Sequence, residues 1–243
     1  MSDFDQISNI RFSIFTPSKI TESKEDLFEM FFGSMPEDSR LYNKELDMGK
    51  DGFLNSRKNS TTVEAMMYYE HGQKYDFLYS PIASVAPESF PVIGNAQQLI
   101  DDGFEGFERL LKFLPENIAR VAVAVTAIKA QPGKTEAYEL FSQKFPSLEI
   151  DVENDEEFSF KINKRKKSEY NGQPLVYNLL VGYMAAKVQV NVAKENEIVD
   201  SHVFYASTRE LDCNTGYMTD LRTGSEENLL VVASEIRNLI NSF

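Results

Sequence analysis

Three oxygen-bearing side chains recur at every second position in the segment TRELDCNT: Glu210, Asp212 and Asn214. Alternate residues of a β-strand share one face, and hard divalent cations prefer carboxylate and amide oxygens. The spacing makes these residues a candidate Mg²⁺ or Ca²⁺ site. Successive members would lie about 6.5 to 7 Å apart at the backbone, so a cation would need further ligands from other segments. We favour the competing interpretation, the polar side of a half-buried strand.

A second candidate lies in AIKAQPGKTEAYELF, where Gly133, Lys134 and Thr135 stand between an expected buried strand and an expected helix. Phosphate-binding loops occur in this setting because the first amides of a helix lack intrahelical partners. A P-loop also needs a glycine five positions before Gly133, where this chain has Ile128, and Pro132 has no amide hydrogen. We favour a simple turn and keep an anion site at the helix start as the alternative.

Four consecutive cations, Lys164, Arg165, Lys166 and Lys167, follow an acidic segment at 149–157. Such a group can contact phosphate or an acidic partner. Lysine on an edge strand also prevents pairing with another chain, and we favour this second interpretation. Contact with a protein or with nucleic acid remains the alternative.

Nucleophilic and zinc chemistry have few candidate residues in this chain. Cys213 is the single cysteine, and the two histidines are His71 and His202. One cysteine and two separated histidines do not make a zinc site. A pair of Cys213 with His202 across neighbouring strands is conceivable, but a cysteine on an apolar face is usually an inert small side chain. The sequence therefore predicts no catalytic residue and no cofactor.

Charge and composition limit the class of protein. The 243 residues include 25 basic and 38 acidic side chains, which gives a net charge of −13. A field of this sign repels nucleic-acid backbones and anionic membranes, so we expect neither as a partner. The single cysteine excludes an internal disulfide, no signal-peptide pattern is visible, and the apolar stretches fall short of the ~20 residues of a membrane span. These features predict a soluble cytoplasmic protein.

Hydrophobic periodicity places the elements that must position these side chains. Ser23 and Gly33 mark the ends of a short first helix, and Pro115 ends a second one. A polar stretch at 36–60 predicts a long loop, and the prolines of 81–95 predict a connector. His71 and Gly72 are expected in a hairpin turn. The expected strands lie near 9–15, 61–80, 118–130, 147–152, 158–163, 175–192, 198–207 and 209–215, and the expected helices near 23–32, 104–114, 135–144 and 225–243.

These elements predict an α+β fold, a mainly antiparallel sheet with packed helices. The run 118–130 is apolar on both sides and is expected in the middle of the sheet. The order of strand, turn and helix recurs near 9–32, 118–145 and 209–243, which leaves two similar halves open. We expect residues 1–243 to form a single compact unit, with a sub-boundary, if there is one, near 146–157.

Three functions remain after these considerations. No complete catalytic set can be assembled, so the sequence favours a non-enzymatic cytoplasmic binding or protein-interaction module of acidic character, with another protein or a second copy of the chain as its partner. Enzymatic activity is left uncertain, with the balance toward none. The alternative is a phosphate- or nucleotide-handling enzyme that uses 131–135 and a divalent metal. A nucleic-acid contact through 161–167 is a third hypothesis, against which the net charge argues.

Overall fold

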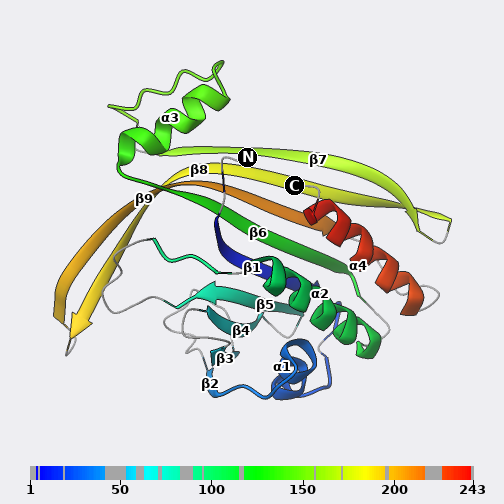
Figure 1. Cartoon of the computed structure of the whole chain (residues 1–243). Helices are drawn as coiled ribbons and strands as arrows, with labels where there is room; N and C mark the ends of the chain where they lie inside the picture. Colours follow the sequence, from blue (N-terminus) through cyan, green and yellow to red (C-terminus); the bar gives the residue numbers. More distant parts are fainter. Residues whose placement is uncertain are drawn as a thin grey trace.

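A computed structural model of the chain describes residues 4, 6–18, 20–41, 53–58, 63–70, 73–82, 90–94, 96–114, 118–155, 157–170, 172–194, 197–216 and 226–241. Figure 1 shows a large twisted sheet with helices packed against it. The elements are β1 (Gln6–Phe15), α1 (Lys24–Phe32), β2 (Asp38–Leu41), β3 (Phe53–Lys58), β4 (Val63–Glu70), β5 (Lys74–Pro81), α2 (Ala96–Phe113), β6 (Arg120–Gln131), α3 (Lys134–Lys144), β7 (Phe158–Tyr170), β8 (Gln173–Lys194), β9 (Glu197–Thr215) and α4 (Glu226–Asn241).

The described strands form one sheet in the order β2-β3-β4-β5-β1-β6-β9-β8-β7, and every pair of neighbouring strands is antiparallel. The prediction of an α+β fold with a mainly antiparallel sheet is confirmed, and so is the central place of β6. Strand β7 lies at one edge of the sheet, where it pairs with β8 and with no other described strand.

The two faces of the sheet differ in what covers them. We call one the helix face, because Phe12 of β1 lies there against rings from α1 and α2. Helix α3 packs on the same face, since Ser207 donates a hydrogen bond of 3.1 Å to the carbonyl of Ala137. Helix α4 also packs there, where Ser168 of β7 donates to Glu235. The opposite side, which we call the back face, has no helix packed on it in the described part of the chain.

Phe12 shows how the core is held together. Its ring is fully buried and lies 5.2 Å from Phe104, edge-on, and 5.4 and 5.6 Å from Phe31 and Phe107. Close contact is possible because Gly103 and Gly106 of α2 carry no side chain: a Cβ on Gly103 would come within 2.3 Å of Phe12, and one on Gly106 within 2.2 Å of the Phe31 carbonyl. Aromatic residues thus build much of the core.

The order of elements repeats along the chain. One strand and one helix are followed by further strands and a second helix, first from β1 to α2 and again from β6 to α4. Each set of strands is contiguous in the sheet, and the two sets meet where β1 pairs with β6. A sub-boundary near 146–157 stays a prediction.

Several local expectations can be compared with the structure. The Ser23 side chain accepts a hydrogen bond of 3.0 Å from the Asp26 amide, and Gly33 ends α1 with φ of 77°, as predicted. The expected loop at 36–60 instead contains β2 and β3, and the expected strand at 147–152 is wrong. There Asp151 accepts hydrogen bonds from the amides of Glu153 and Asn154, which makes a turn. The hairpin turn at His71 and Gly72 lies outside the described residues.

Strands β8 and β9 extend beyond the rest of the sheet. Their partners stop early, because β6 ends opposite Tyr205 and β7 begins opposite Ala185. The remaining residues of β8 and β9 pair only with each other and form a two-stranded ribbon, at the left of Figure 1.

No helix in the described part of the chain combines the length and apolar character needed to cross a membrane.

Candidate functional site

Glu210, Asp212 and Asn214 lie side by side on the back face of β9, as the alternation predicted. Leu211 and Cys213 point to the helix face, where they are 4% and 0% exposed. The three polar residues make contacts with neighbouring strands. Asp212 lies 3.7 Å from a guanidinium nitrogen of Arg11 on β1 and accepts a hydrogen bond of 2.7 Å from Asn214.

Further contacts complete this polar row. Asn178 of β8 donates a hydrogen bond of 3.2 Å to Asn214, and Lys161 of β7 lies 3.9 Å from Glu210. Among the residues that the structure describes, no group of three or more His, Cys, Asp or Glu side chains could hold a metal ion. The row therefore joins β1, β9, β8 and β7 by hydrogen bonds and ion pairs. Its proposed metal role stays a prediction.

Gly133, Lys134 and Thr135 lie at the start of α3. Gly133 is the residue before the helix and has extended backbone, with φ of −160°. A Cβ at Gly133 would lie 2.9 Å from a carboxylate oxygen of Glu136, so an acidic side chain already occupies the space beside the first amides of the helix. The Lys134 ammonium lies 5.4 Å from the centre of the Tyr138 ring. The negative charge of Glu136 and the face of the Tyr138 ring therefore lie beside the position that a bound phosphate would occupy.

The loop after α3 adds a further carboxylate to this end of the molecule. A hydrogen bond from the Asn154 side chain is the main cause that lowers the pKa of Asp151, and the positive charge of Lys134 contributes as well. Asp151 is therefore ionised at neutral pH and close enough to Lys134 to sense its charge.

The two candidate clusters lie on opposite faces of the sheet. The start of α3 is on the helix face, whereas Glu210 and Asp212 are on the back face. Glu210 pairs with Thr126 of β6, whereas α3 begins after β6 ends at Gln131. Thr126 and Gln131 are five residues apart, so the two clusters are also separated by about 17 Å along the strand. The described residues thus do not bring the lysine and the carboxylates of the alternative enzyme hypothesis together. That hypothesis remains a prediction without an assembled site.

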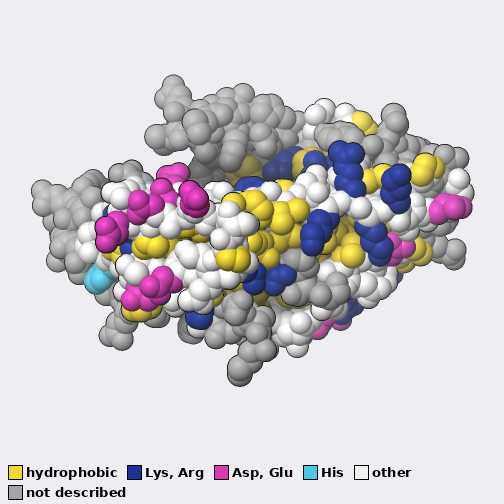
Figure 2. All heavy atoms as spheres, turned by 90° about the horizontal axis from the view of Figure 1, so that it is seen from above, with side chains coloured by type: hydrophobic (Ala, Val, Ile, Leu, Met, Phe, Trp, Pro, Cys, Tyr) yellow, Lys and Arg dark blue, Asp and Glu magenta, His cyan; other side chains and the backbone are white. Residues whose placement is uncertain are grey.

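The basic segment, Lys164 to Lys167, occupies the middle of the edge strand β7, and all four side chains are exposed. Strand alternation divides them between the faces: Lys164 and Lys166 stand opposite Leu179 and Tyr177 of β8, whereas Arg165 and Lys167 are on the back face. Figure 2, which looks down on this edge, shows Lys and Arg side chains gathered in its right half and acidic side chains mainly at the left.

These four cations differ from several others in the protein. Arg11, Lys74, Lys161 and Arg237 each lie within 4.0 Å of a carboxylate oxygen. No residue of the basic segment forms such an ion pair with any carboxylate that the structure describes. The positive charge of the segment is therefore not neutralised by an ion pair, and it is exposed to solvent on both faces of the edge strand.

Cys213 does not take part in a reactive pair. It lies on the helix face, whereas His202, at an even position of the same strand, lies on the back face. Burial, with a smaller contribution from the neighbouring charge of Asp212, raises the pKa of the Cys213 thiol to about 12. The conceivable Cys213 and His202 pair is wrong, and the thiol stays protonated at neutral pH.

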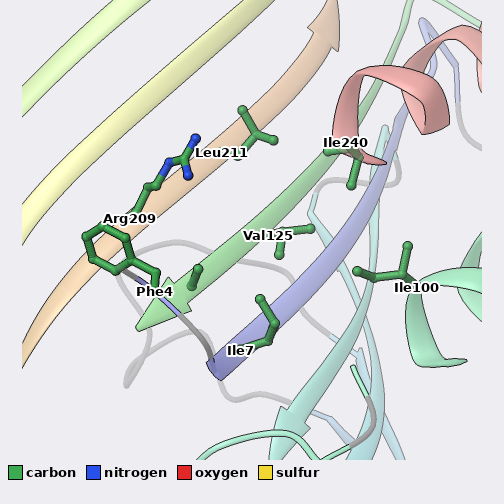
Figure 3. Close-up of a pocket in the computed structure, with 8 residues that line it drawn as sticks. Phe4, Ile7, Ile100, Val125, Arg209, Leu211 and Ile240 are labelled. Carbon is green, nitrogen blue, oxygen red and sulfur yellow. The ribbon is translucent and has the colours of Figure 1, made fainter. Parts of the chain in front are cut away.

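A pocket that the sequence did not predict lies on the helix face between the sheet, α2 and α4 (Figure 3). Its polar group is Arg209 of β9, and the nearby apolar side chains come from β1, β6, α2 and α4. The signal for Arg209 was present in the sequence, because this arginine is at an inward position, between Ser207 and Leu211. What it faces depended on two helices that are distant in sequence.

No family model matches this sequence, and no curated protein does. Among solved structures, the chain is similar to a rolling circle replication initiator protein from Geobacillus stearothermophilus. That match has 14% sequence identity, covers 96% of this chain and 78% of the other, and has a TM-score of 0.27. At such values the match transfers no activity and no substrate to this chain.

Two predictions from the sequence are corrected here. The protein in the match is a replication initiator. The match supports neither the interpretation of the chain as a non-enzymatic protein-interaction module nor the exclusion of nucleic acid as a partner, and neither prediction is retained. The net charge was a poor basis for excluding nucleic acid. A net charge of −13 is a sum over the whole chain, whereas charges farther apart than a screening length of about 8 to 10 Å act almost independently in physiological salt.

Proposed function

We propose that the protein binds nucleic acid, with the basic segment as its principal contact to the phosphate backbone. One observation carries this proposal: four consecutive exposed cations on the edge strand, without a described carboxylate within ion-pair distance. Lysine and arginine neutralise phosphates and release the counterions condensed on them, which is the main source of affinity that is independent of base sequence.

The geometry of β7 suits a polyanion. The segment from Lys164 to Lys167 extends over about 10 Å, a length over which each strand of a duplex presents about three phosphates. Because the cations point to both sides of an edge, a backbone that passes along this edge can meet them from either face.

Edge protection alone would not need this arrangement. One or two charges are enough to stop strand addition, and carboxylates would serve as well. In a protein with 38 acidic residues, four adjacent cations make an attractive patch inside a repulsive surface. Binding then has a defined direction, since the acidic end around α3 repels the same ligand.

The experiment that tests this proposal is a salt titration of binding to labelled DNA and RNA, with variants of the basic segment. A slope that falls when Lys166 and Lys167 are neutralised supports it, and binding that does not depend on them overturns it. We also propose a cytoplasmic location, which is supported by the single cysteine, kept as a buried thiol.

A further inference from the structure

An aromatic side chain continues the basic segment on the helix face of β7. Strand alternation places Phe160, Ile162, Lys164 and Lys166 on this one side of the strand. The Phe160 ring is partly exposed, and both lysines are exposed. Figure 2 shows hydrophobic side chains next to Lys and Arg side chains along this edge of the sheet. The row therefore joins an aromatic ring to two cations on one accessible surface.

The Phe160 ring belongs to a small aromatic cluster beside α3. Its centroid lies 5.1 Å from that of Phe145, the residue after α3, and the two ring planes are inclined by 55°. Phe145 in turn lies 5.1 Å from Tyr183, which stands opposite Phe160 on β8. These contacts hold the ring in place, so a ligand does not have to order it. Phe158, two residues earlier, differs because one face of its ring is stacked on the buried Phe141, at 4.8 Å and 19°.

We propose that this row binds a single strand of nucleic acid in preference to a duplex, with phosphates on Lys164 and Lys166 and a base stacked on Phe160. The inference rests on the nucleic-acid binding proposed above and names the form of the ligand. Every base has a flat π surface, so stacking on an aromatic side chain attracts single strands of any sequence. In a duplex the bases are paired and stacked on each other, and a ring at the sheet edge reaches them only if the duplex opens.

The spacing of side chains along β7 favours an extended strand. Alternate residues of an antiparallel β-strand are about 6.8 Å apart, which is twice the rise of about 3.4 Å per nucleotide in one strand of a duplex. A nucleic-acid strand without a complement can lengthen toward this spacing, and its separated bases then gain from an aromatic partner. From Phe160 to Lys166 the row extends over about 20 Å, which is enough for about three nucleotides at this spacing.

The change of charge along the chain orients the ligand. Acidic residues are concentrated at 149–157, directly before β7, and the basic segment follows at 164–167, with Phe160 between the two. A base carries no charge and tolerates the acidic side, whereas the phosphates are attracted to the cations and repelled by the carboxylates. Phe160 is therefore placed to receive a base at the point where the backbone of the ligand turns away from the acidic segment.

Fluorescence anisotropy of the whole chain with three ligands of equal length tests the inference. The ligands are a single strand of mixed sequence, the same strand paired with its complement, and a strand of abasic sites that keeps the phosphates but has no bases. Stacking on an aromatic side chain contributes about 5- to 140-fold in affinity per base. At physiological salt, we therefore expect the single strand to bind at least about fivefold more tightly than either of the other two ligands, with DNA and with RNA.

Variants of β7 assign the stacking to one ring. Phe160→Leu should lower the affinity for the single strand at least about fivefold and leave the salt slope unchanged, because it removes no charge. Phe160→Tyr keeps an aromatic ring and should keep the affinity. Phe158→Leu is the matched control, since it is the same substitution on the same face of the same strand, and it should leave single-strand binding unchanged. Circular dichroism confirms that each variant is folded.

Three results would overturn this assignment: a duplex bound as tightly as the single strand, an abasic strand bound as tightly as one with bases, or an unchanged single-strand affinity in folded Phe160→Leu. The comparison with the abasic strand uses the unaltered protein, so it decides the question even where a variant does not fold. Binding that depends on Lys166 and Lys167 but not on Phe160 would leave the nucleic-acid proposal standing and remove the stacking inference alone. An unaltered protein that binds neither DNA nor RNA in any form would remove both.

Discussion

Neutralising two adjacent cations of the basic segment should weaken DNA binding and also reduce its dependence on salt. The informative variant is Lys166→Gln with Lys167→Gln, because these exposed residues lie on opposite faces of the edge strand. The matched control is Lys112→Gln with Lys187→Gln. Both control residues are exposed, one on α2 and one on β8, and the change in net charge is the same.

The expected magnitude follows from the number of phosphates that the segment neutralises. Four contacts to duplex DNA give a slope of about −3.6 for the logarithm of the binding constant against the logarithm of salt concentration, and two contacts give about −1.8. Between about 50 and about 200 mM salt, the unaltered protein should lose about 150-fold in affinity, whereas the double variant should lose about 12-fold. Each lost contact lowers affinity by about eightfold near 100 mM salt.

Fluorescence anisotropy with a labelled duplex and a labelled single strand measures these slopes directly. The control variant should keep the slope of the unaltered protein and change its affinity only slightly. The reasoning is refuted if both double variants weaken binding equally, since net charge alone would then be the cause. It is also refuted if the unaltered protein binds neither DNA nor RNA at low salt. A salt slope that does not change when Lys166 and Lys167 are replaced would refute it as well.

Three further predictions concern stability and reactivity. Gly106→Ala should lower the free energy of unfolding by about 1 to 3 kcal/mol, because the new Cβ would meet the Phe31 carbonyl at 2.2 Å. Urea unfolding measures this loss as a lower midpoint, although alanine by itself favours helices. A higher midpoint would show that α2 can shift. The hydrogen bond from Arg237 lowers the pKa of Asp101 below its ordinary 3.8, so its contribution to stability is present above that pH and is lost as the pH falls through the lower folded value. Asp101→Asn should therefore destabilise the protein at pH 7 and make its stability less sensitive to acid, as followed by urea unfolding at a series of pH values. Cys213, with a pKa raised to about 12, should not react with a thiol reagent at pH 8 until urea unfolds the chain; rapid reaction of the folded protein would contradict its burial.

Features decided by neighbours in sequence could be predicted. The cap at Ser23 and the end of α1 at Gly33 depend on a few adjacent residues, and so does the alternation from Leu211 to Asn214. The same kind of pattern misled at 147–152. There apolar and acidic residues alternate as in a strand, but the Asp151 side chain binds nearby amides and makes a turn instead.

Features that depend on distant partners could not be predicted. Strands β2 and β3 are polar and short, and they exist because each finds a neighbour in the sheet. The charge of Lys164 to Lys167 was visible in the sequence, but its place on an edge, without described carboxylates in contact, was not. Arg209 stood out as an inward cation only once α2 and α4 had been placed around it.

The place of β1 between β5 and β6 has a consequence during synthesis of the chain. When β5 leaves the ribosome, β1 can pair on one side, but its other side must wait for β6, roughly 50 residues later. At about 5 to 20 residues per second, this interval lasts roughly 3 to 10 s. A half-made sheet therefore presents an open strand to the crowded cell in every round of translation, and a chaperone that shields it would raise the yield of folded protein.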